Sequence, residues 1–65
     1  MQIKVNGEIL NEFSGSIAEL LKKMSLSADR VAVEYNGDIL TRENFKTTIL
    51  KNNDVVEIVA FVGGG

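Results

Sequence analysis

The chain has 65 residues and a formal net charge of -2, and it contains neither cysteine nor histidine. This length predicts one domain, and without those two residue types it cannot build a Cys or Ser/His nucleophile, a disulfide, or a thiolate or imidazole metal site. The Lys and Arg residues form no basic stripe, and no apolar run approaches the roughly 18 residues of a membrane span. The first residues also lack a secretion pattern, so we expect a cytoplasmic protein that binds neither nucleic acid nor membrane.

Two short strands joined by a tight turn are predicted first. Residues 2–6 alternate between polar and apolar side chains and lead into Asn6-Gly7, a dipeptide that accommodates the positive φ angles of a two-residue hairpin turn. Residues 8–13 fit the second strand, with the apolar side chains of Ile9 and Leu10 on opposite faces.

An amphipathic helix is predicted next. Ser16 and Glu19 have the spacing of a capping box. Apolar residues then recur at i, i+3, i+4 and i+7, namely Ile17, Leu20, Leu21 and Met24. These positions predict a helix from about Ser16 to Met24 with its apolar stripe in the core.

A third strand and a short helical segment follow. Residues 31–35 alternate up to a second Asn-Gly pair, and residues 38–40 can pair with them beyond that turn. Thr41 is then expected to cap a helical segment over residues 42–49, in which Phe45 and Ile49 face inward.

The last predicted strand suggests the topology. Residues 52–54 are typical of a turn, and residues 55–60 are a β-branched run of the kind found at a sheet centre. If this strand lies beside and parallel to the first, with the helix over one face, the fold is α+β, a ubiquitin-like β-grasp. We expect a mixed sheet of four to five strands, one main helix and one short helical segment, in a domain of residues 1–60 followed by a flexible tail of residues 61–65.

The tail is glycine-rich and ends in Gly63, Gly64 and Gly65. Fully extended, three residues can carry a terminal carboxylate on the order of 10 Å from the domain. Because glycine has no Cβ, such a tail can enter a narrow channel in another protein. A flexible linker would have the same composition, so the tail alone does not decide between the two interpretations.

Apolar residues near the tail form a candidate docking surface. Alternation places Val55, Val59 and Phe61 on one face of the last strand and Val62 on the other, and one helix can cover only one face of a sheet. Exposed apolar side chains beside a reactive tail indicate a partner site, so we select these four residues.

Three segments together resemble the ThiS family of sulfur carriers. They are residues 31–40 (VAVEYNGDIL) with Arg42 after them, residues 49–59 (ILKNNDVVEIV), and the Gly-Gly end. The resemblance covers nearly the whole chain. The family often has glycine where Asn53 stands and proline where Thr41 stands; asparagine also tolerates a left-handed turn, so the first difference preserves the turn.

The resemblance implies a function for the tail. In this family a ThiF-like adenylyltransferase uses ATP and magnesium to convert the carboxylate of the last residue, here Gly65, into an acyl adenylate. A persulfide sulfur donor protein then supplies sulfur, and the resulting thiocarboxylate serves thiazole synthase in thiamine biosynthesis. The carrier binds no cofactor and is not itself an enzyme.

Three other interpretations stay open. The chain could be a molybdopterin-synthase small subunit or another ubiquitin-like sulfur carrier, with a different acceptor for the same tail. It could be a modifier that forms isopeptide bonds to lysine. A structural β-grasp module with incidental glycines would tolerate the loss of Gly64 and Gly65.

Overall fold

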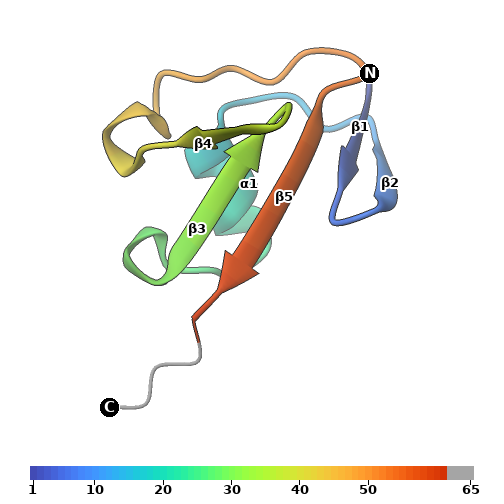
Figure 1. Ribbon diagram of the computed structural model, residues 1–65. Helices are drawn as coiled ribbons and strands as arrows, with labels where there is room; N and C mark the ends of the chain where they lie inside the picture. Colours follow the sequence, from blue (N-terminus) through green and yellow to red (C-terminus); the bar gives the residue numbers. More distant parts are fainter. Residues whose placement is uncertain (62–65) are drawn as a thin grey trace.

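The computed structural model describes residues 1–61, which form a five-stranded sheet with one α-helix and two short 3-10 helices (Figure 1). The elements in chain order are β1 (Gln2–Val5), β2 (Glu8–Asn11), α1 (Ile17–Lys23), η1 (Ala28–Arg30), β3 (Val31–Tyr35), β4 (Asp38–Leu40), η2 (Arg42–Asn44) and β5 (Val55–Ala60). No helix among the described residues has both the length and the apolar character needed to cross a membrane.

The strands are arranged in the order β2-β1-β5-β3-β4, with the last strand in the centre. β1 and β5 are parallel, and Val5 is in register with Val56; the other neighbouring strands are antiparallel. Helix α1 lies behind the sheet in the view of Figure 1 and covers one of its faces. The predicted β-grasp topology, with an apolar terminal strand between the two hairpins, is confirmed.

Both hairpins turn at the predicted Asn-Gly pairs. The φ angles are 51° and 84° at Asn6 and Gly7, and 50° and 90° at Asn36 and Gly37. Positive φ at both central residues characterises the turn whose twist matches that of two antiparallel strands. The Asn6 side chain also accepts a hydrogen bond from the Ile58 amide at 2.6 Å, so the first turn is joined to β5.

Helix α1 begins at the predicted capping box. The Glu19 amide donates to Ser16 Oγ at 3.1 Å, and the Ser16 amide donates to Glu19 Oε1 at 2.8 Å. Gly15, with φ 142°, is needed for this closure, because a Cβ at that position would lie 2.7 Å from Glu19 Oε1. The helix ends at Lys23, and the C-cap residue Met24 is 38% exposed, so placing Met24 in the core stripe was wrong.

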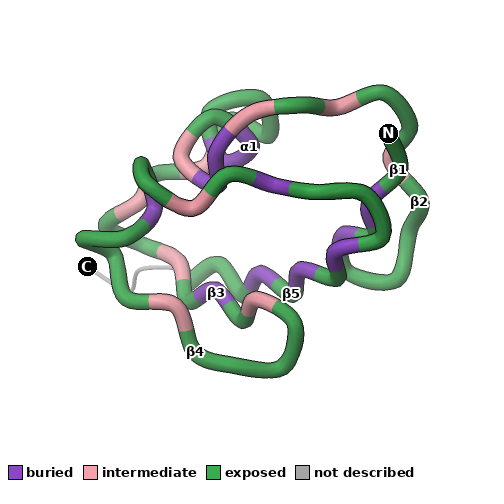
Figure 2. Tube along the Cα trace, turned by 90° about the horizontal axis from the view of Figure 1, so that it is seen from above, coloured by how far each residue is buried: buried purple, intermediate pink, exposed green. Residues whose placement is uncertain are grey.

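The core lies between α1 and the sheet face that the helix covers. Figure 2 shows buried positions on α1 and along β3 and β5. The buried apolar residues are Ile3, Val5, Ile17, Leu20, Leu21, Val33, Phe45, Leu50, Val56 and Ile58. They come from both ends and the middle of the chain, so no isolated segment could bury its own apolar face.

The prediction for residues 42–49 was partly wrong. Only η2 is helical there, and the side chain of Thr41 does not cap it. Phe45 is buried as predicted, with 3% of its surface exposed, but Ile49 is 58% exposed and Leu50 is buried in its place.

Backbone pairing with the start of α1 explains this difference. The Leu50 amide donates to the Gly15 carbonyl at 2.8 Å, and the Ile17 amide donates to the Thr48 carbonyl at 3.0 Å. Residues 45–47 form a turn, and residues 48–50 then run extended beside the helix N-terminus, where alternate side chains face opposite ways. This period places Leu50 inward and Ile49 outward.

Candidate functional site

The predicted reactive tail is only partly described. Gly63, Gly64, Gly65 and Val62 lie outside residues 1–61, so their proposed roles stay predictions. Phe61 is the last described residue, and its amide donates to the Arg30 carbonyl at 2.7 Å. The pairing of β5 with the start of β3 thus continues to Phe61.

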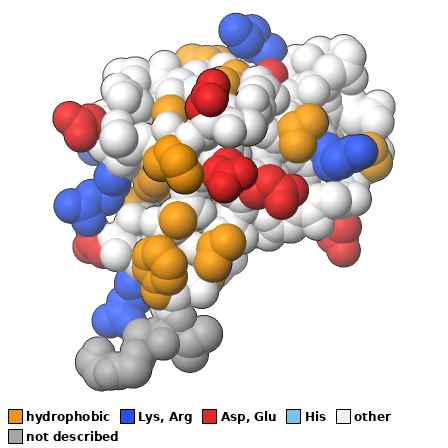
Figure 3. Space-filling model, viewed as in Figure 1, with side chains coloured by type: hydrophobic (Ala, Val, Ile, Leu, Met, Phe, Trp, Pro, Cys, Tyr) orange, Lys and Arg blue, Asp and Glu red, His pale blue; other side chains and the backbone are white. Residues whose placement is uncertain are grey.

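Three of the four predicted docking residues are exposed on the sheet face that α1 does not cover. We call this face the outer face. Val55 is 40% exposed, Val59 is 60% exposed and Phe61 is 57% exposed. Figure 3 shows hydrophobic side chains gathered near the end of β5. The expected exposure of these three side chains is confirmed.

The structure divides these residues into two groups. Val59 is directly opposite Ala32 of β3, and Phe61 follows on the same face of the chain. We call Ala32, Val59 and Phe61 the apolar patch. Val55 lies at the other end of β5, separated from Val59 on this face by the charged Glu57. The predicted docking surface is therefore not continuous.

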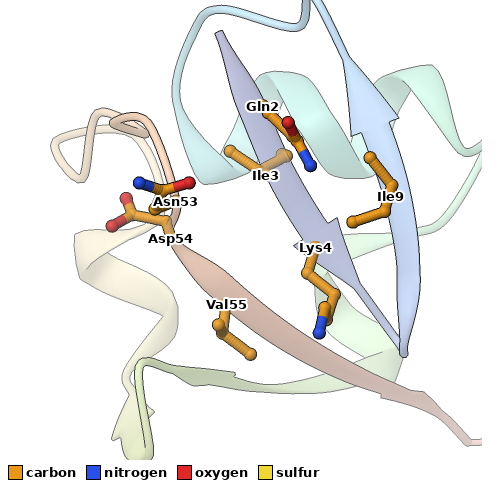
Figure 4. A pocket seen from close by; sticks show the side chains of 7 residues that line it. All are labelled: Gln2, Ile3, Lys4, Ile9, Asn53, Asp54 and Val55. Carbon is orange, nitrogen blue, oxygen red and sulfur yellow. The ribbon is translucent and has the colours of Figure 1, made fainter.

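Val55 belongs to a shallow hollow at the β1 side of the sheet. Its lining residues are Gln2, Ile3, Lys4, Ile9, Asn53, Asp54 and Val55 (Figure 4). Lys4 is in register with Ile9 on one side and with Val55 on the other, so the hollow crosses three adjacent strands. This lining mixes three aliphatic side chains with two amides, one cation and one carboxylate, whereas the region around Val59 is apolar.

Beside the apolar patch lie two carboxylates. Glu34 of β3 and Glu57 of β5 are directly opposite each other, and Ile39 of β4 is opposite Glu34. All three side chains are exposed, and 71% of the surface of Ile39 is accessible. The sequence alone does not reveal this carboxylate pair, because its proximity depends on strand register and not on spacing along the chain.

A polar network supports the start of β5. Tyr35 Oη donates to Asp54 Oδ2 at 2.6 Å, Asn36 Nδ2 donates to Asp54 Oδ1 at 3.1 Å, and the Lys51 amide donates to Oδ2 at 2.8 Å. Asn53, within the preceding turn, has φ 72°, which confirms that it occupies a left-handed turn position. The network therefore joins this turn to the β3–β4 hairpin.

The same network shifts two pKa values. Although burial of Asp54 opposes ionisation, the hydrogen bonds from Tyr35, the Lys51 amide and Asn36 lower the pKa of its carboxyl group below the ordinary value. The hydrogen bond to Asp54 and burial raise the pKa of Tyr35 to about 12. Since Asp54 and Tyr35 already have structural partners, we assign them to stability. Within residues 1–61, no three acidic side chains come together to form a metal site.

Comparison with known proteins decides the family. The sequence model of the ThiS family matches residues 3–65. The chain belongs to the ThiS family. The crystal structure of the thiamine biosynthesis protein ThiS from Geobacter metallireducens is similar over 100% of both chains, with a TM-score of 0.80 and 39% sequence identity. This likeness agrees with the β-grasp fold described above.

Curated relatives include one small ThiS protein and larger enzymes. The sulfur carrier protein ThiS of Bacillus subtilis is 42% identical over 52 residues, which cover 80% of this chain and 79% of that protein. Thiazole synthases of Magnetococcus marinus and Paramagnetospirillum magneticum are 36% and 37% identical over 100% of this ThiS-family chain. The chain spans only 20% of the length of each of these two enzymes.

Proposed function

We propose that this ThiS-family chain carries sulfur for thiamine biosynthesis as a thiocarboxylate on Gly65. The observation that carries the proposal is the family match, which extends over residues 3–65 and so includes all three final glycines. The named carrier from Bacillus subtilis and the fold shared with the Geobacter protein support it. In this role the chain is a co-substrate of other enzymes and not a catalyst.

The proposed chemistry takes place in two stages at Gly65. In an adenylyltransferase, a carboxylate oxygen attacks the α-phosphorus of magnesium-bound ATP, and pyrophosphate leaves. The terminal sulfur of a donor protein's persulfide then attacks the acyl carbon, and AMP leaves. A thiol cleaves the resulting acyl disulfide, which releases the thiocarboxylate and forms a new disulfide on the donor side. The chain has no cysteine, so it cannot carry the sulfur as a persulfide of its own.

Thiazole synthase is the proposed acceptor of the sulfur. Two enzymes of that name contain, within one polypeptide, a segment similar to this entire chain. Joining two modules in one chain raises the effective concentration of each at the other, an advantage when they act on the same intermediate. The two relatives therefore support a functional pairing between a ThiS-like domain and thiazole synthase.

The described residues provide the proposed docking surface for these partners. The apolar patch ends at Phe61, only a few residues before the reactive group. Glycines at 63 and 64 would let the tail pass through a channel too narrow for side chains. We therefore retain Val59 and Phe61 as docking residues near the tail, together with Val62, and place Val55 in a separate contact region.

The test is sulfuration of the purified chain. The chain is incubated with a ThiF-like adenylyltransferase, magnesium, ATP and a persulfide donor, and intact-protein mass spectrometry looks for replacement of one oxygen by sulfur in the C-terminal peptide. We expect sulfuration of the parent chain and none in a variant with one extra residue after Gly65. The extension moves the carboxylate away from the α-phosphorus, and such positioning supplies much of the rate enhancement of a two-substrate reaction.

Two comparisons make the test specific. Gly64→Val should also prevent activation, while its denaturation midpoint should equal that of the parent. Sulfuration of the extended variant at the parental rate would contradict the assignment of Gly65. Sulfur transfer from the parent chain to molybdopterin synthase, and not to thiazole synthase, would favour the related carrier function instead.

A further inference from the structure

We propose that Glu34 and Glu57 together bind an arginine side chain of the enzyme that activates Gly65. This inference rests on the proposed function, which it extends by naming the chemistry of recognition. We call these two residues the carboxylate pair. Their positions in the sheet make them neighbours, since nothing in their sequence spacing brings them together.

The register places the two carboxylates side by side on the outer face. Glu34 and Glu57 are directly opposite in the antiparallel pairing of β3 and β5. Directly opposed residues have Cβ atoms about 4.5–5.5 Å apart. Both side chains are exposed, whereas the residues on either side of them in β5, Val56 and Ile58, are buried. The two negative charges therefore share one small area of surface.

This arrangement is unfavourable for the isolated chain. Like charges directly opposite each other destabilise a sheet. Among residues 1–61 the ion pair formed is Arg42 with Asp29, on a different part of the molecule, and neither member of the carboxylate pair has a cationic partner. Of the cations near the outer face, Lys4 is in register with Val55 at the β1 side, and Arg30 lies at the end of β5, where its carbonyl accepts from the Phe61 amide. The local charge is thus uncompensated within the described structure.

The surroundings of the carboxylate pair are apolar. Ala32 and Val59 occupy the next opposed positions toward the end of β5, and Ile39 is opposite Glu34 on β4. A partner covering these side chains would exclude water from the carboxylates. Removing water strengthens attraction to an opposite charge and makes an unpaired carboxylate costly, so the covering surface must bring a cation. The planar guanidinium of arginine, with several donors, fits two adjacent carboxylates better than a lysine ammonium does.

The position of the site identifies the partner. Gly65 is four positions after Phe61 in the sequence, and an extended chain spans at most about 3.6 Å per residue, so the Gly65 carboxylate can reach no farther than about 14 Å from Phe61. An enzyme that holds this carboxylate must come close to the end of β5 and to the adjoining outer face. A second copy of this chain is a poor alternative, because a two-fold contact through the same face would bring two carboxylate pairs together.

The test compares two double variants with the same change in net charge. Glu34→Gln with Glu57→Gln removes the carboxylate pair. Glu8→Gln with Glu43→Gln removes two exposed carboxylates outside the outer face. The adenylyltransferase assay is ATP–pyrophosphate exchange, with KM for the carrier and kcat measured at low and high salt.

We expect the first double variant to raise KM at least tenfold at low salt and to leave kcat unchanged. Its KM should also lose most of the salt dependence of the parent, since salt screens the interaction that has been removed. The control variant should behave like the parent, and both variants should unfold cooperatively, which shows that each is folded.

Other outcomes separate this inference from the proposed function. Parental KM in the first double variant, or equal increases in both variants, would overturn the carboxylate-pair site while leaving Gly65 activation intact. A concentration-dependent dimer abolished by Ile39→Ala would assign this face to a second copy and would also overturn it. If the parent chain supports no exchange with any ThiF-like enzyme, the proposed function itself fails and the inference with it.

Discussion

The two faces of β5 carry similar apolar residues, but those on one face are buried and those on the other are exposed. Toward α1, Val56 is 0% exposed and Ile58 is 7% exposed; on the outer face, Val55 is 40% exposed and Val59 is 60% exposed. The chemistry of a valine side chain therefore does not decide its role. Alternation along the strand assigns each residue to a face, and only one face has a helix to cover it.

The difference teaches how so small a domain can provide a binding surface. The apolar residues that hold the fold together form one cluster on the inner side, which includes the helix residues and Phe45. Side chains of the outer face make few stabilising contacts in the isolated chain. They can therefore be selected for binding, even with two like charges opposite each other, without unfolding the protein.

The largest expected effect on stability comes from a substitution in the core between α1 and the sheet. Leu21→Ala should lower the free energy of unfolding by roughly 2 to 5 kcal/mol, because it leaves a cavity under the helix. Leu21 is 2% exposed, whereas Met24, one turn later, is 38% exposed and provides the control Met24→Ala. Chemical denaturation measures both. Similar midpoints for the two variants would mean that the helix does not pack against the sheet as described.

An intermediate effect on the free energy of unfolding is expected from substitutions that compare the two faces of β5. Val56→Ala should destabilise the protein by about 2 to 3 kcal/mol, since it removes buried methyl groups and leaves a cavity. Val59→Ala deletes the same atoms from an exposed position, so its effect on the free energy of unfolding should stay within about 0.5 kcal/mol. In the adenylyltransferase assay Val59→Ala should have the larger effect of the two, because it should raise KM for the carrier. Equal free energies of unfolding for the two variants would contradict the assignment of Val56 to the buried face and Val59 to the exposed one.

A smaller effect concerns the polar network at the start of β5. Tyr35→Phe removes the donor to Asp54 and should cost about 1 to 2 kcal/mol at neutral pH. Because the network lowers the pKa of Asp54, its stabilisation is present above the carboxyl group's unfolded pKa and is lost as the pH falls through the lower folded value. The protein should therefore lose stability in acid, below about pH 4.

The stability contributed by Tyr35 depends on pH in the opposite direction to that of Asp54, because it is lost at alkaline pH. The pKa of Tyr35 is raised from 10.0 to about 12, so its contribution is complete below pH 10 and is lost as the pH rises toward 12. The chain has one tyrosine, so phenolate absorbance reports this group alone. Denaturation at several pH values should show a steeper alkaline loss for the parent than for Tyr35→Phe. A phenolate midpoint near 10 would contradict the hydrogen bond to Asp54.

Local signals predicted much of the fold. The capping box at Ser16, the two Asn-Gly turns and the β-branched run of β5 act over a few residues, and the structure contains each of them where expected. These signals depend on backbone conformation and short-range hydrogen bonding, so they can be interpreted without knowing what lies nearby. The parallel pairing of β1 with β5 followed from placing the most apolar strand at the sheet centre.

The errors occurred where distant contacts override local preference. Residues 45–50 have a spacing compatible with a helix, yet hydrogen bonds to Gly15 and Ile17 hold residues 48–50 extended and bury Leu50 instead of Ile49. Met24 fits the helical stripe, but the helix ends at Lys23, and Met24 at its C-cap is partly exposed. For residues 48–50, a partner remote in sequence determined which side chain reached the core.

The sequence by itself determined the β-grasp pattern, the helix with its cap, the two hairpin turns and the exposed character of Val59 and Phe61, because each depends on local conformation or on strict alternation. Only the tertiary structure decided that Val55 lines a hollow with Lys4 and Ile9, and that Glu34 and Glu57 are neighbours. Strand register is set by the packing of the whole core, and a shift of one residue would move every side chain of a strand to the other face. The neighbours on the outer face are therefore a consequence of the residues buried on the inner one.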